Sequence, residues 1–312
     1  MGKTSKDKRD IYYRKAKEVG FRARSAFKLM QIDDEYNLFE GVSKVVDLCA
    51  APGSWSQVLS SKLFSKDDPE STKNNRIVAV DLQEMAPIDG VLSIVGDITA
   101  QSTSEQIISY FQGDGADLVV CDGAPDVTGL HDIDEYMQAQ LLLAALNITT
   151  NILRPGGNFV AKIFRGKDVS LLYSQFRCFF KEVTVAKPKS SRNSSIESFI
   201  VCRNYCPPEG FQASMTTLLL DHKYSAVRGN ALMGSAALVV PFVACGDLNG
   251  LDADKSYPLQ LEETGDTHAQ QQLPSAPTGS AGEAGKGYQY VYRPPVQPPI
   301  NPNYHTYQQR TA

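Results

Sequence analysis

The sequence lacks the patterns that mark several large classes of protein. None of its six cysteines forms a CxxC pair, so their spacing indicates neither a zinc knuckle nor a disulfide framework. No apolar run approaches the roughly 20 residues that span a bilayer, and the charged N-terminus is unlike a secretory signal. We therefore expect a cytosolic protein with reduced thiols and no membrane anchor.

Charge is distributed unevenly along the chain. Residues 1–30 contain ten Lys or Arg residues against three acids, a local charge of +7, whereas the whole chain carries −4 and the remainder therefore −11. A basic segment on an acidic body suits a polyanion that binds at one place. A solvated helix face would explain the same charges equally well.

Short apolar runs alternate with helix-like segments over some 200 residues. The runs lie at 44–48, 77–80, 91–95, 117–120, 158–161 and 198–201. Residues 55–64 and 132–153 have helical spacing; in the second, Asp132 and Glu135 indicate a capping box and Pro-Gly-Gly at 155–157 indicates the end. We expect an α/β fold with a mostly parallel, doubly wound, Rossmann-like sheet and helices on both faces.

Composition divides the chain into three parts. Residues 1–205 contain the alternating pattern, preceded by about 40 residues of basic helical material. Residues 206–263 contain one more apolar run, at 237–244, and we expect this extension to dock on the core or on a partner. Residues 264–312 are rich in Gln, Pro, Gly and Ser, which is typical of a disordered tail.

The first apolar run leads into a turn, Ala50-Ala-Pro-Gly53, and then a helix. Gly53 would let the backbone approach a ligand closely, and the turn is not the GxGxxG loop of a nicotinamide site. Acids follow three other runs, at Asp81, Asp97 and Asp122. One acid could bind a ribose diol and another an adenine amino group. A single acid often only caps a helix, but three in register predict a pocket for an adenosine-containing ligand.

Four motifs resemble those of the FtsJ-like 2′-O-ribose methyltransferases. They are Asp47-Leu-Cys-Ala-Ala-Pro-Gly-Ser-Trp55, Cys121-Asp-Gly-Ala-Pro-Asp126, Phe159-Val-Ala-Lys-Ile-Phe164 and Ser190-Ser-Arg-Asn-Ser-Ser-Ile-Glu197. The resemblance covers about residues 1–205, and the motifs occur in the family's order. It implies a class I methyltransferase fold that binds S-adenosylmethionine through Gly53, Trp55, Asp81, Asp97 and Asp122.

The same resemblance puts the family's catalytic tetrad on Lys28, Asp122, Lys162 and Glu197, without substitution. Methyl transfer needs the 2′-oxygen in line with the S–C bond and its proton removed. We assign the base role to Lys162, because it follows the end of a strand that reaches the catalytic edge. Lys28 and partial burial would lower its pKa, whereas Asp122 and Glu197 oppose that effect; a charged Lys162 that only orients the hydroxyl is the alternative. No metal is required. Taken singly, Lys162 could be a snorkelling lysine, Asp122 a helix cap and Glu197 a solvent-facing strand start.

The N-terminal segments 3–13 and 22–28 resemble most closely the eukaryotic cytoplasmic branch of the family, which modifies tRNA positions 32 and 34. The resemblance implies tRNA as substrate, and separate WD-repeat and helical-repeat subunits that direct the enzyme to each position. A ribose is accessible where the strand is open, as in a hairpin loop. The residues predicted to bind RNA phosphates are Lys8, Arg9, Arg14, Arg22, Arg24, Lys189 and Arg192.

Three other functions stay open. The same chemistry could act on ribosomal RNA or on a messenger cap. An NAD-dependent oxidoreductase is disfavoured because the chain has no GxGxxG. A catalytically inactive RNA-binding scaffold is disfavoured because the tetrad is intact.

Overall fold

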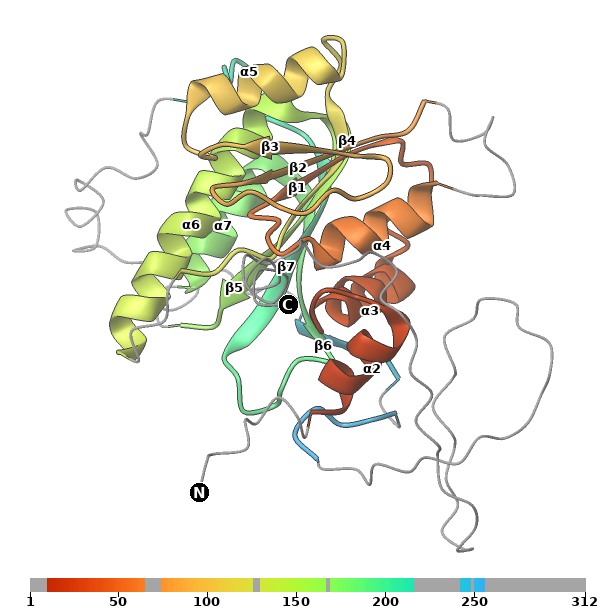
Figure 1. Ribbon diagram of the computed structural model, residues 1–312. Helices are drawn as coiled ribbons and strands as arrows, with labels where there is room; N and C mark the ends of the chain where they lie inside the picture. The colour runs from red at the N-terminus through yellow and green to blue at the C-terminus, as the bar shows by residue number, and fades with distance from the viewer. Residues whose placement is uncertain are drawn as a thin grey trace, which may run out of the picture.

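A computed structural model of the chain (Figure 1) describes residues 10–64, 74–125, 130–166, 169–215, 242–247 and 250–255. The elements in chain order are α2 (Ile11–Val19), α3 (Ala26–Tyr36), β1 (Lys44–Leu48), α4 (Ser54–Leu63), β2 (Arg76–Asp81), β3 (Val91–Val95), α5 (Gln101–Tyr110), β4 (Ala116–Cys121), α6 (His131–Ile152), β5 (Leu153–Phe164), α7 (Val169–Phe179), β6 (Phe180–Pro188), β7 (Glu197–Tyr205) and β8 (Phe242–Cys245). Lys8, Arg9, Asp126 and the tail 264–312 lie outside the described residues.

The strands of the described part form one sheet in the order β3-β2-β1-β4-β5-β7-β6-β8. The pairs from β3 across to β5 are parallel, β7 is antiparallel to both β5 and β6, and β8 is parallel to β6. Leu48 lies opposite both Val80 and Cys121, so the carboxyl ends of β1, β2 and β4 meet at one edge. The predicted mostly parallel sheet is confirmed.

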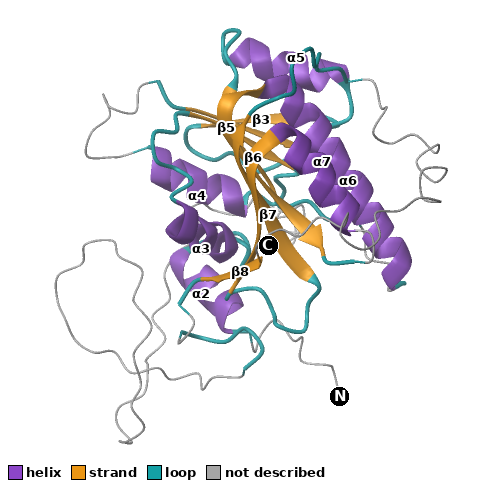
Figure 2. Cartoon of the chain, turned by 180° about the vertical axis from the view of Figure 1, so that it is seen from behind, coloured by secondary structure: helices purple, strands orange, loops and turns teal. Residues whose placement is uncertain are grey.

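Helices cover both faces of the sheet, as Figures 1 and 2 show from opposite sides. Side chains alternate along each strand, and β1 shows the consequence. Val46 belongs to a core cluster with α5, α6 and α7, whereas Val45 belongs to a second cluster with α3 and α4. The candidate catalytic residues lie at the edge of the sheet where the carboxyl ends of β1, β2 and β4 meet, between the helices of the two faces.

The start and end of α6 differ from the sequence prediction. Leu130 is the residue before the helix and its side chain makes no capping bond, so the predicted capping box at Asp132 and Glu135 is wrong. Asp132 instead lies in the first turn, where a carboxylate is favoured by the helix dipole. The helix ends at Ile152, one residue before the predicted end, and Pro155-Gly-Gly follows it within β5, which begins at Leu153.

The described parts of the 206–263 extension contact the rest of the molecule. β8 pairs with β6, and Ala253 packs against Ile11 and Ala16 of α2. The Tyr12 hydroxyl donates to Leu251 O at 3.0 Å. No helix among the described residues is long and apolar enough to cross a membrane.

Candidate active site

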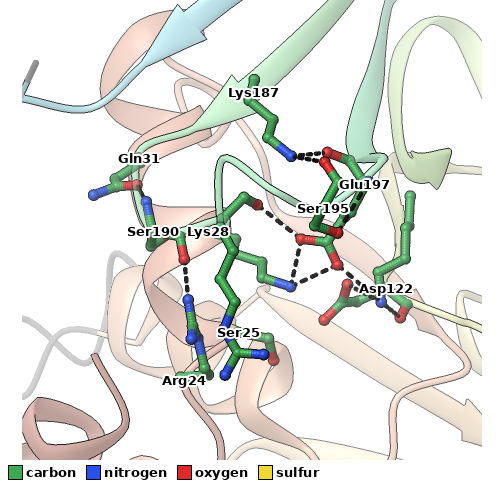
Figure 3. Close-up of polar contacts among 12 residues, drawn as sticks. Arg24, Ser25, Lys28, Gln31, Asp122, Lys187, Ser190, Ser195 and Glu197 are labelled. Atoms are coloured by element: carbon green, nitrogen blue, oxygen red, sulfur yellow. Dashed lines mark hydrogen bonds and ion pairs between the residues drawn. The ribbon is translucent and has the colours of Figure 1, made fainter. Parts of the chain in front are cut away.

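Four charged side chains from distant parts of the chain meet at the carboxyl edge of the sheet, and Figure 3 labels three of them, Lys28, Asp122 and Glu197. Lys28 comes from α3, Asp122 follows β4, Lys162 lies near the end of β5, and Glu197 begins β7. The antiparallel register pairs Phe164 with Glu197, which puts the last residue of β5 beside the first residue of β7. The structure therefore brings together all four residues of the predicted tetrad.

Glu197 is the acceptor at the centre of this cluster. Lys28 Nζ lies 2.8 Å from each of its carboxylate oxygens, and Ser191 Oγ donates to Oε1 at 2.7 Å. Burial raises the pKa of Glu197, but the charges of Lys28 and Lys162 outweigh that effect and lower the pKa to about 2. Glu197 is consequently ionised at every pH near neutrality.

Lys162 is held mainly by Asp122. Its Nζ lies 2.8 Å from Asp122 Oδ1, donates to Asp122 O at 2.8 Å, and lies 3.8 Å from Glu197 Oε2. Burial lowers the pKa of Lys162, but Asp122 and Glu197 together raise it above its ordinary value. Lys162 is therefore a charged ammonium in this structure, which is the state that the alternative orienting role requires.

The turn between β1 and α4 suits a closely approaching ligand. Gly53 has a φ of +100° and precedes α4, and its side-chain-free position gives the first N–H groups of the helix no capping side chain. A Cβ at Gly53 would come within 2.7 Å of Arg22 Nη1 and 2.9 Å of Ile88 Cδ1. The positive φ favours glycine here, and a side chain at this position would also displace the ends of the Arg22 and Ile88 side chains.

Acids line the same edge beyond the neighbouring strands. Asp81 Oδ2 accepts from Ala51 N at 2.9 Å, which fixes the turn against the end of β2. Asp97 is exposed, and its Oδ1 accepts from the N–H and hydroxyl of Thr99, both at 2.8 Å. Carboxylates accept hydrogen bonds from hydroxyl and amino groups and repel phosphate. Together with Asp122, these residues fit an adenosine-containing, positively charged cofactor such as S-adenosylmethionine.

Trp55 differs from the other predicted cofactor contacts. Its side chain is only 1% exposed, its indole N–H donates to Ser25 O at 2.8 Å, and its ring centroid lies 5.6 Å from that of Phe199. The ring therefore belongs to the core between α3, α4 and the sheet. A ligand could meet Trp55 only through its backbone, in the first turn of α4.

Most of the described residues predicted to bind RNA contact the protein itself. The Arg22 guanidinium donates to Pro52 O and to Pro87 O, both at 2.9 Å. Arg24 contacts Asp10 and Ser190 O (Figure 3), and Arg192 Nη2 lies 3.2 Å from Asp10 Oδ2. Lys189 Nζ lies 4.0 Å from Asp252 Oδ2, and Arg14 lies on α2. These cations hold the N-terminal helices and the 189–192 loop in place.

The structure also places two further cationic side chains, Arg165 and Lys187, at this edge. Arg165 is exposed, its N–H donates to Ile196 O at 3.0 Å, and its guanidinium lies 5.3 Å from the ring centroid of Phe242. The half-buried Lys187 donates to Ser195 O at 2.8 Å and to Glu197 O. Burial, with help from Arg165 and Lys28, lowers the pKa of Lys187 to about 8 despite the opposing charge of Glu197.

The sequence analysis missed Arg165, because one arginine after a strand carries no signal of its own. It also missed Gln138, whose side chain is buried under this edge. The signal for Gln138 was available: it is a polar residue that shares helical spacing with the apolar face of α6. Among the described residues, no group of three or more His, Cys, Asp or Glu side chains could bind a metal ion.

Comparison with known proteins agrees with this geometry. The FtsJ-like methyltransferase family matches residues 21–205. Human tRNA (cytidine(32)/guanosine(34)-2′-O)-methyltransferase is 59% identical over 304 residues, which cover 97% of this chain and 83% of the human protein. The Schizosaccharomyces pombe protein of the same name is 56% identical over 279 residues, which cover 89% of this chain and 95% of that protein.

A solved structure supports the fold as well. The crystal structure of a Plasmodium falciparum protein assigned as a ribosomal RNA methyltransferase superposes with a TM-score of 0.51 at 25% identity, over 60% of this chain and 100% of that chain. The expected Rossmann-like methyltransferase fold is thereby confirmed. Since the family match takes in more than half of the sequence and full-length relatives exceed 50% identity, the chain belongs to the FtsJ-like methyltransferases.

Proposed function

We propose that this chain transfers a methyl group from S-adenosylmethionine to a ribose 2′-hydroxyl of tRNA, at anticodon-loop positions 32 and 34. The observation that carries the proposal is the cluster of Lys28, Asp122, Lys162 and Glu197 at the edge where Gly53 precedes α4. The names of the human and fission yeast relatives support the two tRNA positions.

The tetrad residues would bind the 2′-hydroxyl and remove its proton. When bound, S-adenosylmethionine supplies an electrophilic methyl group on a positively charged sulfur. Both ammonium groups lie within 4 Å of the Glu197 carboxylate, so a hydroxyl beside that carboxylate would meet Lys28 and Lys162 together. Two positive charges there stabilise negative charge as it develops on the 2′-oxygen. Glu197, ionised near neutral pH, can accept the hydroxyl's hydrogen bond.

The base role of Lys162 requires a change from the state described above. Asp122 and Glu197 keep Lys162 charged in the absence of ligands, and a charged ammonium cannot accept a proton. A nearby sulfonium and the exclusion of water would both lower its pKa. We therefore propose that charged Lys162 first orients the hydroxyl, releases one proton to solvent as cofactor and RNA bind, and then accepts the proton of the 2′-hydroxyl as a neutral amine.

We propose that RNA crosses the carboxyl edge of the sheet with its open loop over the tetrad. Arg165 is exposed directly after the strand that carries Lys162, which suits a contact with a flanking phosphate. Arg22, Arg24 and Arg192 would shape the rim of the site, because their guanidinium groups contact protein oxygens. We also propose that separate WD-repeat and helical-repeat subunits select the position in the cytoplasm.

The test is methylation of purified RNA with radiolabelled S-adenosylmethionine. Unmodified tRNA, ribosomal RNA and capped messenger RNA are supplied separately, and the modified nucleotide is mapped. We expect label at ribose 32 or 34 of tRNA, with the partner subunits added where the chain alone is inactive. Label confined to ribosomal RNA or to the cap would replace the proposed substrate, and total tRNA from cells lacking the protein should lose the same 2′-O-methyl groups.

A further inference from the structure

Gln138 of α6 is a buried polar side chain directed at the ends of two catalytic strands. It is 2% exposed and shares one face of the helix with the buried residues Leu142, Ala145 and Thr149. Its Nε2 donates to Gly123 O at 3.2 Å and to Lys162 O at 3.0 Å. One side-chain amide therefore joins the loop after β4 to the main chain of Lys162.

These two carbonyls lie beyond the last residues that β4 and β5 pair with each other, although β5 goes on pairing with β7 as far as Phe164. The last residues that β4 and β5 pair with each other are Cys121 and Ala161. Asp122 and Lys162 come one residue later on each strand, beyond this pairing. Main-chain carbonyls that lack a ladder partner need another donor when they are buried. The Gln138 amide supplies one to each strand, and it does so next to both members of the Asp122–Lys162 ion pair.

The ion pair depends on main-chain position as well as on side chains. Lys162 Nζ contacts both Oδ1 and the main-chain oxygen of Asp122, each at 2.8 Å, so a shift of either strand end would break at least one contact. Gly123 is confined from the other side, because a Cβ there would come within 2.8 Å of Cys49 Cβ. The loop after β4 is thus fixed between Cys49 and Gln138.

We propose that Gln138 is a positioning residue for methyl transfer, which holds the ends of β4 and β5 in the register that lets Lys162 reach Asp122. The inference rests on the proposed function of the tetrad. Gln138 does not touch the reacting atoms; it acts through Lys162 and Asp122. A misplacement of catalytic groups by about 1 Å can lower turnover on the order of 100-fold.

The matched control is Thr149 on the same face of α6. Thr149 is fully buried, and its Oγ1 donates to Ala145 O at 2.6 Å, within its own helix. It lies 11 residues further along, about 16 Å from Gln138 at the usual helical rise. Thr149→Val removes a buried hydrogen bond whose donor and acceptor both belong to that helix, so no hydrogen bond to β4 or β5 is lost.

The experiment compares full-length Gln138→Met and Thr149→Val with the wild type. For Gln138→Met we expect kcat to fall at least tenfold, with the affinity for S-adenosylmethionine and the KM for tRNA within about threefold. In lysine-labelled protein studied by NMR, the pKa of Lys162 should fall in Gln138→Met, because the contact with Asp122 loosens, and should stay unchanged in Thr149→Val. Normal kcat in Gln138→Met, or an equal loss in Thr149→Val, would overturn the proposal.

Gln138→Glu provides a second test of the proposal, which can be used if Gln138→Met does not fold. A protonated glutamic acid has one O–H to donate to one of the two carbonyls, whereas the ionised form has none. The activity of Gln138→Glu relative to wild type should therefore rise as pH falls, and a ratio independent of pH would contradict the proposal. The NMR measurement needs no substrate, so a wild type that fails to methylate tRNA would refute the proposed function while the positioning role is still judged by the Lys162 signal.

Discussion

At the scale of single residues, the site is a set of nearly buried charges that compensate one another. Lys28 and Lys162 face Asp122 and Glu197, and all four side chains are less than 20% exposed. A buried charge without its partner is costly, so the loss of any one member should destabilise the fold. Effects on catalysis must therefore be separated from effects on folding.

Lys162→Ala should abolish methyl transfer and leave S-adenosylmethionine binding largely intact, because the cofactor contacts lie on other strand ends. The variant should also lose about 3 kcal/mol of stability, since Asp122 loses its buried partner. Calorimetry beside a radiolabel assay measures both effects. Lys44→Ala is the control, as Lys44 pairs with exposed Asp114 at the opposite edge and should retain activity. Near-normal turnover of Lys162→Ala would refute the assigned role.

Asp47 predicts how stability depends on pH. It is 0% exposed; burial raises its pKa to about 7, with Asp122 and Asp81 adding to the shift, and Ser56 Oγ, 2.5 Å from Oδ2, opposing it. Between about pH 4 and pH 7 the folded protein keeps a proton that the unfolded chain releases, so stability falls as pH rises through this window.

Asp47→Asn cannot ionise and should remove that dependence. The unfolding free energy of the variant relative to wild type should rise between pH 5 and pH 8, by an amount on the order of a few kcal/mol. Its melting temperature relative to wild type should rise over the same range. Thermal melts across this range measure the difference. A constant difference between the two proteins would show that Asp47 does not titrate in the folded state within the window.

At the scale of elements, the apolar periodicity predicted more of the sheet than of the helices. Strands such as β1 and β4 are buried on both faces, and their continuous apolar runs are visible in the sequence. The strand β6 was missed because charged residues interrupt it near both ends, and α5 because seven of its ten residues are Gln, Ser, Thr or Glu. Their positions depend on packing against β7 and α6, which no local pattern records.

The strand-turn-helix unit around Gly53 permits a paired test. Gly53 and Gly113 both have positive φ, +100° and +88°, so alanine at either should cost about 1–2 kcal/mol in backbone strain. A Cβ at Gly53 also meets Arg22 and Ile88, whereas a Cβ at Gly113 meets nothing within 4 Å. Gly53→Ala should lose at least tenfold in S-adenosylmethionine affinity, and Gly113→Ala should bind normally. Equal affinities in calorimetry would separate Gly53 from the cofactor site.

At the scale of the whole molecule, the sequence predicted which residues form the tetrad but not how they are held. Family motifs placed Lys28, Asp122, Lys162 and Glu197 correctly at one edge, because strand ends converge in any doubly wound sheet. The loop around Ser191 depends on contacts with residues far away in the sequence, Asp10 and Arg24 before it and Cys245 and Asp254 after it. Such long-range contacts have no local sequence signal.

The same contacts predict where the chain can be shortened. Asn193 N donates to Asp254 Oδ2 at 2.6 Å, Lys189 N donates to Cys245 O at 2.8 Å, and Tyr12 binds Leu251 O, so segment 250–255 ties the Ser191 loop to α2. A chain ending at residue 263 keeps these contacts and should retain methyl transfer and melting temperature. A chain ending at residue 249 should melt lower and lose most of its activity, because Ser191 and Glu197 lose their support. Methylation assays with intact tRNA and thermal melts test both truncations. A folded but inactive 1–263 chain would show that residues 264–312 are more than a linker. A fully active 1–249 chain would show that methyl transfer does not depend on segment 250–255.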